Sequence, residues 1–257
     1  TRMGQGVRRA LFIHCTLAHS GIWTGVQAAL LDKLQMTAFD RPGHGLSAPW
    51  TGGDDGTKLH SLVTNIAGSL IDKRADVIGH SYGGLIGMML AARHPDRVGR
   101  LLVVDTLPFF GRLFDPAATP ASIAPRAEQL RAMTVAGAER MKAMPAVTSD
   151  PGGIWSNTPE GRIKVANWGL KADQRAVAQA LYEDIVTDIG PELGKVTAKP
   201  FTILYAAGMG EAQARAVWEP AYAGTPAKLV AVPDSYHFIM LDQPQRFAAQ
   251  VKAFLAE

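Results

Sequence analysis

The sequence predicts an α/β protein: a mostly parallel sheet flanked by helices, with a helical segment inserted between two core strands. Short apolar runs rich in β-forming residues recur, and most precede a turn and a longer segment with helical spacing. This alternation is typical of a parallel sheet with helices on its faces. The 257 residues, 47% of them hydrophobic and 19% charged, are enough for one globular core carrying an insertion.

Six apolar runs account for the expected sheet. Few residues precede the turn at Gly4–Gly6, which leaves little room for strands before the first run. The expected helices begin near Ile22, Lys58, Tyr82, Glu211 and Pro244. The expected strands are Ala10–Ile13, Met36–Phe39, Asp76–Ile78, Leu101–Val104, Phe201–Tyr205 and Lys228–Val232.

The helix at Pro244 closes the chain. Proline suits a first helical turn because its missing N–H has no partner there in any case, and Asp242 is a candidate cap.

Residues 107–198 interrupt the alternation, so residues 1–106 and 199–257 are expected to form the core. Prolines divide the intervening stretch into helical pieces such as Arg126–Met144 and Gln174–Ile189. Such an insertion would form a cap or lid over a site at the carboxyl edge of the sheet. The alternative is a packing layer without a functional role.

Composition narrows the function classes. The 26 basic and 23 acidic residues leave a formal charge of +3, and the basic residues are scattered, which gives no support to nucleic-acid binding. One cysteine, Cys15, excludes an internal disulfide and a thiol-based zinc site. No apolar run is long enough to span a membrane. We expect a cytoplasmic protein whose partner is a small-molecule substrate; the sequence predicts no oligomeric state.

Ser81 is the candidate nucleophile. It stands in Gly79-His-Ser-Tyr-Gly-Gly, between an apolar strand and an apolar helical segment, which is the context that the nucleophile-elbow motif requires. Gly79, Gly83 and Gly84 let strand and helix approach closely. The elbow places the serine at a helix N-terminus, so the Tyr82 N–H is a predicted oxyanion donor. The alternative is a structural serine in a tight turn.

A serine hydroxyl needs an adjacent base, and His237 is the candidate because it follows the last expected strand. The alternative for His237 is a buried loop histidine without a catalytic role. We interpret His80 as a packing residue, and His19 receives no assignment. Local structural roles are expected for His14, His44, His60 and His94.

These residues resemble the α/β-hydrolase superfamily over nearly the whole chain except the insertion. Phe12-Ile-His-Cys-Thr, Asp40-Arg-Pro-Gly-His-Gly-Leu-Ser and the Ser81 motif carry the resemblance. Asp40 and Gly43 shape the turn of the second motif. The family usually has His-Gly-x in the first motif, with x supplying the second oxyanion N–H. Here Cys15 replaces the glycine, and Thr16 takes the donor position.

The resemblance also implies an acid that orients His237. Many relatives carry an aspartate where this sequence has Met209, and the nearest carboxylate is Glu211. The other location known for the fold is the end of the preceding strand, which supplies Asp105. We favour Asp105 over Glu211 because it directly follows a buried-looking strand. The alternative for Asp105 is a structural capping carboxylate, and the alternative for Glu211 is a charge at a helix N-terminus. Asp234, three residues before His237, is a weaker third candidate.

The resemblance implies a hydrolase that cleaves a carboxylic ester, lactone or thioester through an acyl-enzyme, without a metal or organic cofactor. A serine at the elbow argues against haloalkane dehalogenase and epoxide hydrolase chemistry, which use aspartate there. Two alternatives stay open: a carbon–carbon bond hydrolase of a dienone acid, and a slow or non-catalytic ligand-binding protein.

An apolar substrate pocket is a further expectation, with plain core packing as its alternative. For the carbon–carbon hydrolase, basic groups would hold a substrate carboxylate, and Arg41, Arg112 and Arg126 are candidates. The candidate apolar lining residues are Phe109, Phe110, Met133, Met141, Met144, Trp155 and Trp168.

Overall fold

A computed structural model describes residues 1–52, 58–71 and 73–256. Its centre is a seven-stranded sheet in the order β1-β3-β2-β4-β5-β6-β7, parallel except for β1, which pairs antiparallel with β3. The predicted α/β class is confirmed. The strands are β1 (Arg2–Met3), β2 (Arg8–Ile13), β3 (Leu34–Phe39), β4 (Ala75–His80), β5 (Val98–Val104), β6 (Phe201–Ala206) and β7 (Lys228–Val232).

Six of these strands coincide with the predicted runs to within a few residues. β1 was not expected, since so few residues precede the first turn. It forms because Arg2 and Met3 pair with Thr37 and Met36, and because the Ala38 N–H donates to the Thr1 carbonyl at 3.0 Å.

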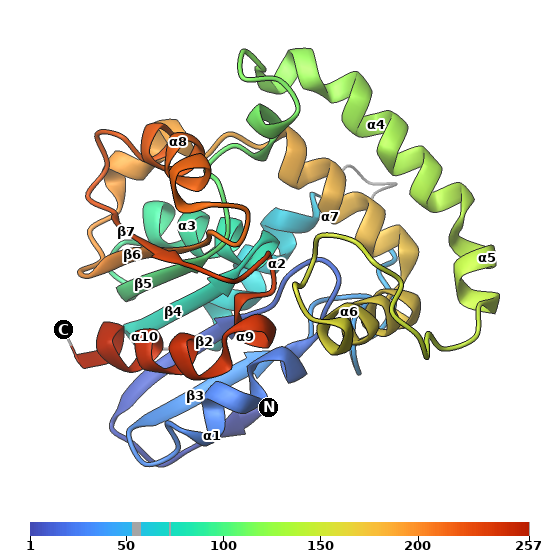
Figure 1. The fold of residues 1–257 in the computed structure, drawn as a ribbon. Coiled ribbons are helices and arrows are strands. Elements are labelled where there is room, and N and C mark those ends of the chain that lie inside the picture. Colours follow the sequence, from blue (N-terminus) through green and yellow to red (C-terminus); the bar gives the residue numbers. More distant parts are fainter. Residues whose placement is uncertain (53–57, 72, 257) are drawn as a thin grey trace.

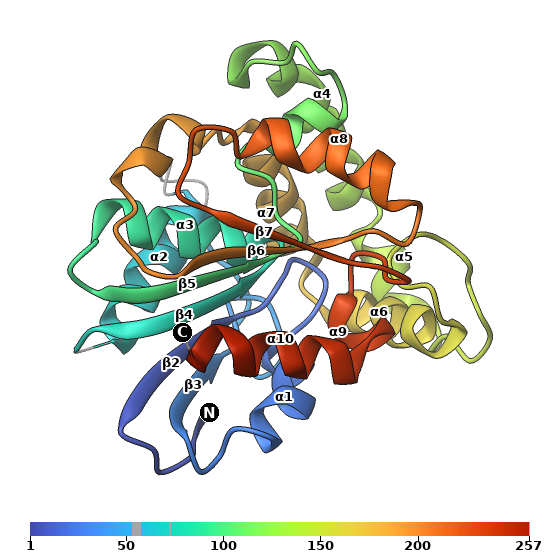
Figure 2. The same ribbon diagram turned by 60° about the vertical axis from the view of Figure 1, so that its left-hand side comes forward.

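Helices cover both faces of the sheet (Figure 1; Figure 2). The face with α2 (Leu59–Leu70), α3 (Tyr82–Arg93) and α8 (Glu211–Ala221) contains one apolar cluster. The opposite face, with η1 (Ser20–Trp23), α1 (Thr24–Ala28), the short α9 (Ile239–Asp242) and α10 (Pro244–Ala256), contains a second cluster around Trp23. None of the described helices is long and apolar enough to cross a membrane.

The segment between β5 and β6 is helical. Figure 1 shows α4 and α5 outermost, with α7 between them and the sheet. α4 begins six residues before the predicted start because Thr119 caps it, Ser122 completes the capping box and Pro120 occupies the first turn. The elements are η2 (Phe110–Leu113), α4 (Pro120–Ala136), α5 (Ala138–Ala143), α6 (Pro159–Lys171), α7 (Gln174–Val186) and η3 (Gly190–Lys195).

Glu183 attaches α7 to the core. Its fully buried carboxylate accepts the backbone N–H groups of Leu59 and His60 at 2.7 and 2.6 Å and the Tyr82 hydroxyl at 2.8 Å. A buried carboxylate is stable only when it is fully hydrogen-bonded. The start of α2, the start of α3 and α7 are therefore held together by one side chain.

The expectation that Asp242 caps the last helix is wrong. Asp242 ends α9, and its carboxylate accepts hydrogen bonds from Ser156, Asn157 and Tyr236 instead. In the folded protein, hydrogen bonds from these three donors replace a local capping contact.

Close backbone packing makes Gly83 irreplaceable at the start of α3. A Cβ there would lie 2.2 Å from the carbonyl oxygen of Ile13, a backbone atom that cannot move aside. We expect Gly83→Ala to lower the free energy of unfolding by about 3 kcal/mol, measured by urea denaturation.

Gly68→Ala is the matched control, because a Cβ at Gly68 in α2 meets nothing closer than 3.7 Å. Alanine is the better helix former, so this variant should be as stable as wild type or up to about 1 kcal/mol more stable. Equal effects of the two substitutions would contradict the packing argument.

Candidate active site

Ser81 lies between β4 and α3 in a backbone conformation that few non-glycine residues adopt, with φ 54° and ψ −126°. Its N–H donates to the carbonyl of Val104 at 2.9 Å, and its carbonyl accepts the Thr106 hydroxyl at 2.8 Å. These contacts hold the residue in the strained conformation. The Tyr82 N–H, at the first position of α3, is one of the helix donors without an intrahelical partner.

His237 and Asp105 form a hydrogen bond of 2.7 Å between Nδ1 and Oδ2. Asp105 also has a positive φ of 50°, and its Oδ1 accepts the Ala206 N–H at 2.8 Å. The backbone bend at the end of β5 thus turns the carboxylate toward the loop after β7.

The two other carboxylate candidates lie elsewhere. Glu211 forms a 2.6 Å ion pair with Arg215 on the exposed side of α8. Asp234 uses its backbone carbonyl to accept the side-chain amides of Asn157 and Gln243. Among the described residues, no hydrogen bond joins the hydroxyl of Ser81 to His237, a contact that commonly tightens only when substrate binds.

His80 has a closer relation to His237 than its prediction as a packing residue implied. Its Nε2 donates to the His237 carbonyl at 2.9 Å, and the two ring centroids lie 4.6 Å apart. Burial lowers the pKa of His80 well below its ordinary value, so the ring is neutral. Sequence spacing carries no signal for this contact, because the two residues are 157 positions apart.

The carbonyls of the loop after β2 are held by side chains from that loop and the next. Arg41 Nη2 and His14 Nδ1 donate to the Cys15 carbonyl at 2.6 and 2.8 Å, and His44 Nε2 lies 2.7 Å from the Thr16 carbonyl. Cys15 has no positive φ, so this loop does not require glycine there. Burial raises the pKa of the Cys15 thiol to about 11.

The three arginines proposed to hold a substrate carboxylate do not line the cavity. Arg41 is fully buried and lies over the Tyr82 ring at 4.9 Å. Arg112 and Arg126 lie over the rings of Phe109 and Phe114. Stacking on aromatic rings competes with a position in the cavity.

A cavity of about 520 Å³ contains Thr16, Ser81, Asp105 and His237 in its lining. Of the apolar residues predicted to line a pocket, Phe110 and Trp155 do so. Met133 and Met144 are instead 63% and 47% exposed, and Phe109, Met141 and Trp168 also lie outside the lining. The apolar lining residues that the sequence did not indicate include Leu107, Leu113, Val177, Leu181, Met209, Val217 and Trp218.

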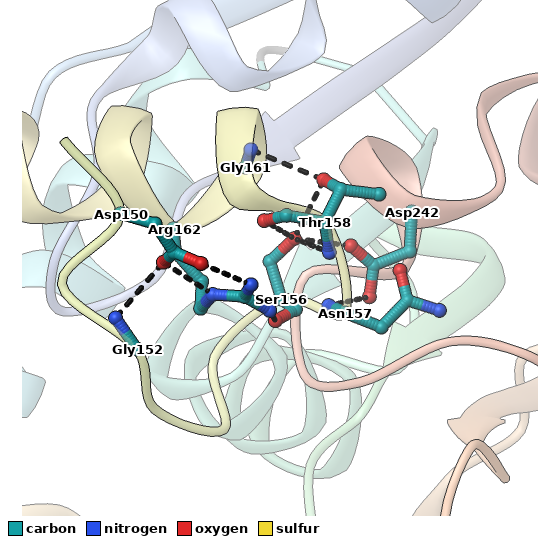
Figure 3. Close-up of polar contacts among 8 residues, drawn as sticks. All are labelled: Asp150, Gly152, Ser156, Asn157, Thr158, Gly161, Arg162 and Asp242. Carbon is teal, nitrogen blue, oxygen red and sulfur yellow. Dashed lines mark hydrogen bonds and ion pairs between the residues drawn. The ribbon is translucent and has the colours of Figure 1, made fainter.

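Asp242 joins the segment before α6 to the loop that carries His237. Figure 3 shows its carboxylate facing Ser156 and Asn157, while Arg162 binds Asp150 on the other side of the same segment. The second carboxylate oxygen also accepts the Tyr236 N–H at 2.7 Å.

The inserted segment also contacts the chain directly after His237. The Phe238 N–H donates to the Trp155 carbonyl at 2.9 Å, and the Trp155 ring lies 5.5 Å from the His237 ring. The inserted segment therefore fixes the backbone on either side of His237.

The described residues contain no group of three or more His, Cys, Asp or Glu side chains arranged to hold a metal ion.

Asp242→Ala should loosen the His237 loop, because it leaves the N–H groups of Asn157 and Tyr236 without an acceptor. We expect a loss of about 2 kcal/mol in stability and faster amide exchange at Tyr236 and Phe238, measured by hydrogen–deuterium exchange. Ser156→Ala removes a single hydroxyl donor and is the milder control. Unchanged exchange in Asp242→Ala would show that other contacts hold this loop.

Comparison with known proteins places this geometry in a family. Lipase LipV of Mycobacterium tuberculosis is 38% identical over 108 residues, which cover 39% of this chain and 38% of the lipase. The pimeloyl-(acyl-carrier protein) methyl ester esterase of Chromobacterium violaceum is 29% identical over 224 residues, which cover 79% of this chain and 86% of that protein. The chain thus spans under half of the first relative and most of the second.

A solved thermophilic esterase from Thermogutta terrifontis has the same fold, with a TM-score of 0.76 and 20% identity over 100% of this chain and 92% of that one. The model described as the Alpha/beta hydrolase family matches residues 10–250. The chain therefore belongs to the alpha/beta hydrolase family.

Proposed function

We propose that this protein is a serine hydrolase that cleaves a carboxylic ester, lactone or thioester of a small, largely apolar substrate. The observation that carries the proposal is the convergence of Ser81, at a strained elbow, and the hydrogen-bonded pair His237–Asp105 on one cavity. A serine nucleophile needs a base, and the base needs an orienting group.

In the proposed reaction, His237 accepts the Ser81 hydroxyl proton as the oxygen bonds to the substrate carbonyl carbon. The N–H groups of Tyr82 and Thr16 stabilise the oxyanion. His237 then returns the proton to the departing alcohol or thiol, which leaves an acyl-enzyme. Water, deprotonated by His237, attacks that ester and releases the acid and the free serine.

Asp105 keeps the Nδ1 proton of His237 in place throughout this cycle, through the 2.7 Å contact. The side chains that bind the Cys15 and Thr16 carbonyls also support the mechanism, since they hold the loop that carries the proposed Thr16 N–H donor. Oxyanion stabilisation depends on donors that are already in position.

The lining of the cavity and the activities of relatives support an ester substrate. The aromatic and aliphatic side chains of Phe110, Trp155, Leu181 and Trp218 suit an apolar acyl or alcohol group. The two relatives described above are a lipase and a methyl ester esterase by name.

We propose that residues 107–198 act as a cap over this site. Trp155 and one face of α7 contribute to the cavity wall, and the hydrogen bonds of Asp242 and Phe238 join the segment to the His237 loop.

Basic groups in the cavity would favour the carbon–carbon hydrolase alternative by holding a substrate carboxylate, but the described residues that line the cavity include no lysine or arginine. Covalent labelling of Ser81 distinguishes a catalytic protein from the non-catalytic alternative.

Labelling with a fluorophosphonate, followed by intact-mass measurement, tests the proposal. Wild type should gain one adduct, and Ser81→Ala none. Asp105→Asn should slow labelling about a thousandfold, because an amide cannot hold the imidazole in the reactive tautomer. Glu211→Gln is the matched control and should label within about twofold of wild type, because Glu211 pairs with Arg215 at the surface.

The absence of any adduct on folded wild type would overturn the serine mechanism and favour a ligand-binding protein. A stronger effect of Glu211→Gln than of Asp105→Asn would reassign the acid.

A further inference from the structure

Asp184 is a carboxylate in the cavity wall that the proposed mechanism does not use. Val177, Leu181 and Asp184 follow each other at intervals of four and three residues on α7, and all three line the cavity that contains Ser81 and His237. This spacing places them on one face of the helix. Asp184 therefore occupies a position on α7 equivalent to those of Val177 and Leu181, two apolar residues that line the cavity.

The neighbouring carboxylate shows what a structural role looks like in this helix. Glu183 accepts hydrogen bonds from two backbone N–H groups, the Tyr82 hydroxyl and the Gln179 amide. Within the described ranges, Asp184 accepts none and forms no ion pair of 4 Å or less. Asp184 is only partly buried and lines the cavity without a protein partner among the described residues, so a polar group of a bound molecule can reach its carboxylate.

The surroundings of Asp184 disfavour the charged form of its carboxyl group. Burial raises the pKa of Asp184 to about 7, an effect opposed by the electrostatic influence of His237 and Arg41. Asp105 is the other carboxylate of the described lining, and it is already bonded to His237 and Ala206. No lysine or arginine among the described lining residues balances Asp184.

We propose that Asp184 is a specificity residue that binds a hydrogen-bond donor, an ammonium or hydroxyl group, on an otherwise apolar substrate. This inference rests on the proposed function, because it assigns the substrate class of the same site. A donor supplied by the substrate satisfies the carboxylate, whereas a substrate carboxylate is repelled by it.

The competing explanation is that Asp184 balances the buried charge of Arg41. Arg41 donates to the Cys15 carbonyl and stacks on Tyr82, but it makes no hydrogen bond to Asp184. A structural counter-charge and a ligand-binding group differ in what their removal does to binding and to stability, and both can be measured.

Calorimetric titration with hexylamine, hexan-1-ol and hexanoate tests the proposal without relying on catalysis. Wild type should bind hexylamine at least about tenfold more tightly than hexanoate, and Asp184→Asn should abolish this preference. Hexan-1-ol separates the two donors: affinity lost in Asp184→Asn for both alcohol and amine identifies a general donor site, and affinity lost for the amine only identifies a cation site.

Glu219→Gln removes an exposed carboxylate on α8, so it changes the net charge equally and should keep the wild-type preference. Wild type without a preference, or a preference that survives Asp184→Asn, would overturn the proposal. Because binding is measured directly, these outcomes remain distinct from a failure of the fluorophosphonate test, which concerns Ser81.

Thermal melting as a function of pH gives the second readout. A carboxyl whose pKa is raised by folding destabilises the folded state when ionised, so Asp184→Asn should raise the Tm above pH 7, with a gain that shrinks as the pH falls. Wild type and Asp184→Asn share the other titratable and charged groups near this position. These groups are Glu183 on α7, Arg41, His237 and Asp105. A lower Tm above this pH, with an unchanged ligand preference, would identify a counter-charge to Arg41 and overturn the proposal.

Discussion

The close approach of the start of α3 to the end of β2 is the constraint on which the rest of the site depends. At Gly83 the helix backbone lies so near the Ile13 carbonyl that no side chain fits between them. This contact brings Ser81 and the loop of Thr16 to the same point, and it gives the helix its first free N–H groups there. The strain at Ser81 follows, because the chain must turn from strand to helix within one residue.

Parallel pairing then brings the remaining groups to the same edge. Asp105 follows β5 and His237 follows β7, and parallel strands end on the same side of a sheet. The final distance is set by local contacts rather than by topology. The positive φ of Asp105 turns its carboxylate, while His80 and Asp242 hold the backbone around His237. Fluorophosphonate labelling therefore tests the reacting groups themselves, and amide exchange tests the contacts that hold the backbone around His237.

The core was predictable because strand runs, glycines and turns are local signals. The segment Asp76–Ile78, the elbow glycines and the starts of α3, α8 and α10 all lie where short-range patterns placed them. Contacts between segments that are distant in the chain have no comparable local signal in the sequence. The role of Asp242, the hydrogen bond from His80 to the His237 carbonyl and the exposure of Met133 depend on how the inserted helices lie against the sheet. The lining of the cavity was accordingly predicted least well.

Glu183 and Asp184 show how adjacent residues of the same chemical type acquire opposite energetic roles. A helix directs successive side chains about 100° apart, so one carboxylate of α7 faces the N-termini of α2 and α3 and the other faces the cavity. The first is satisfied by donors of the protein and stabilises the fold. The second has no such donors among the described residues, and burial penalises its charge. A fold that needed only packing at this position would be more stable with an apolar residue, as at Val177 and Leu181 on the same face. The carboxylate is therefore best explained by a group that arrives with the substrate.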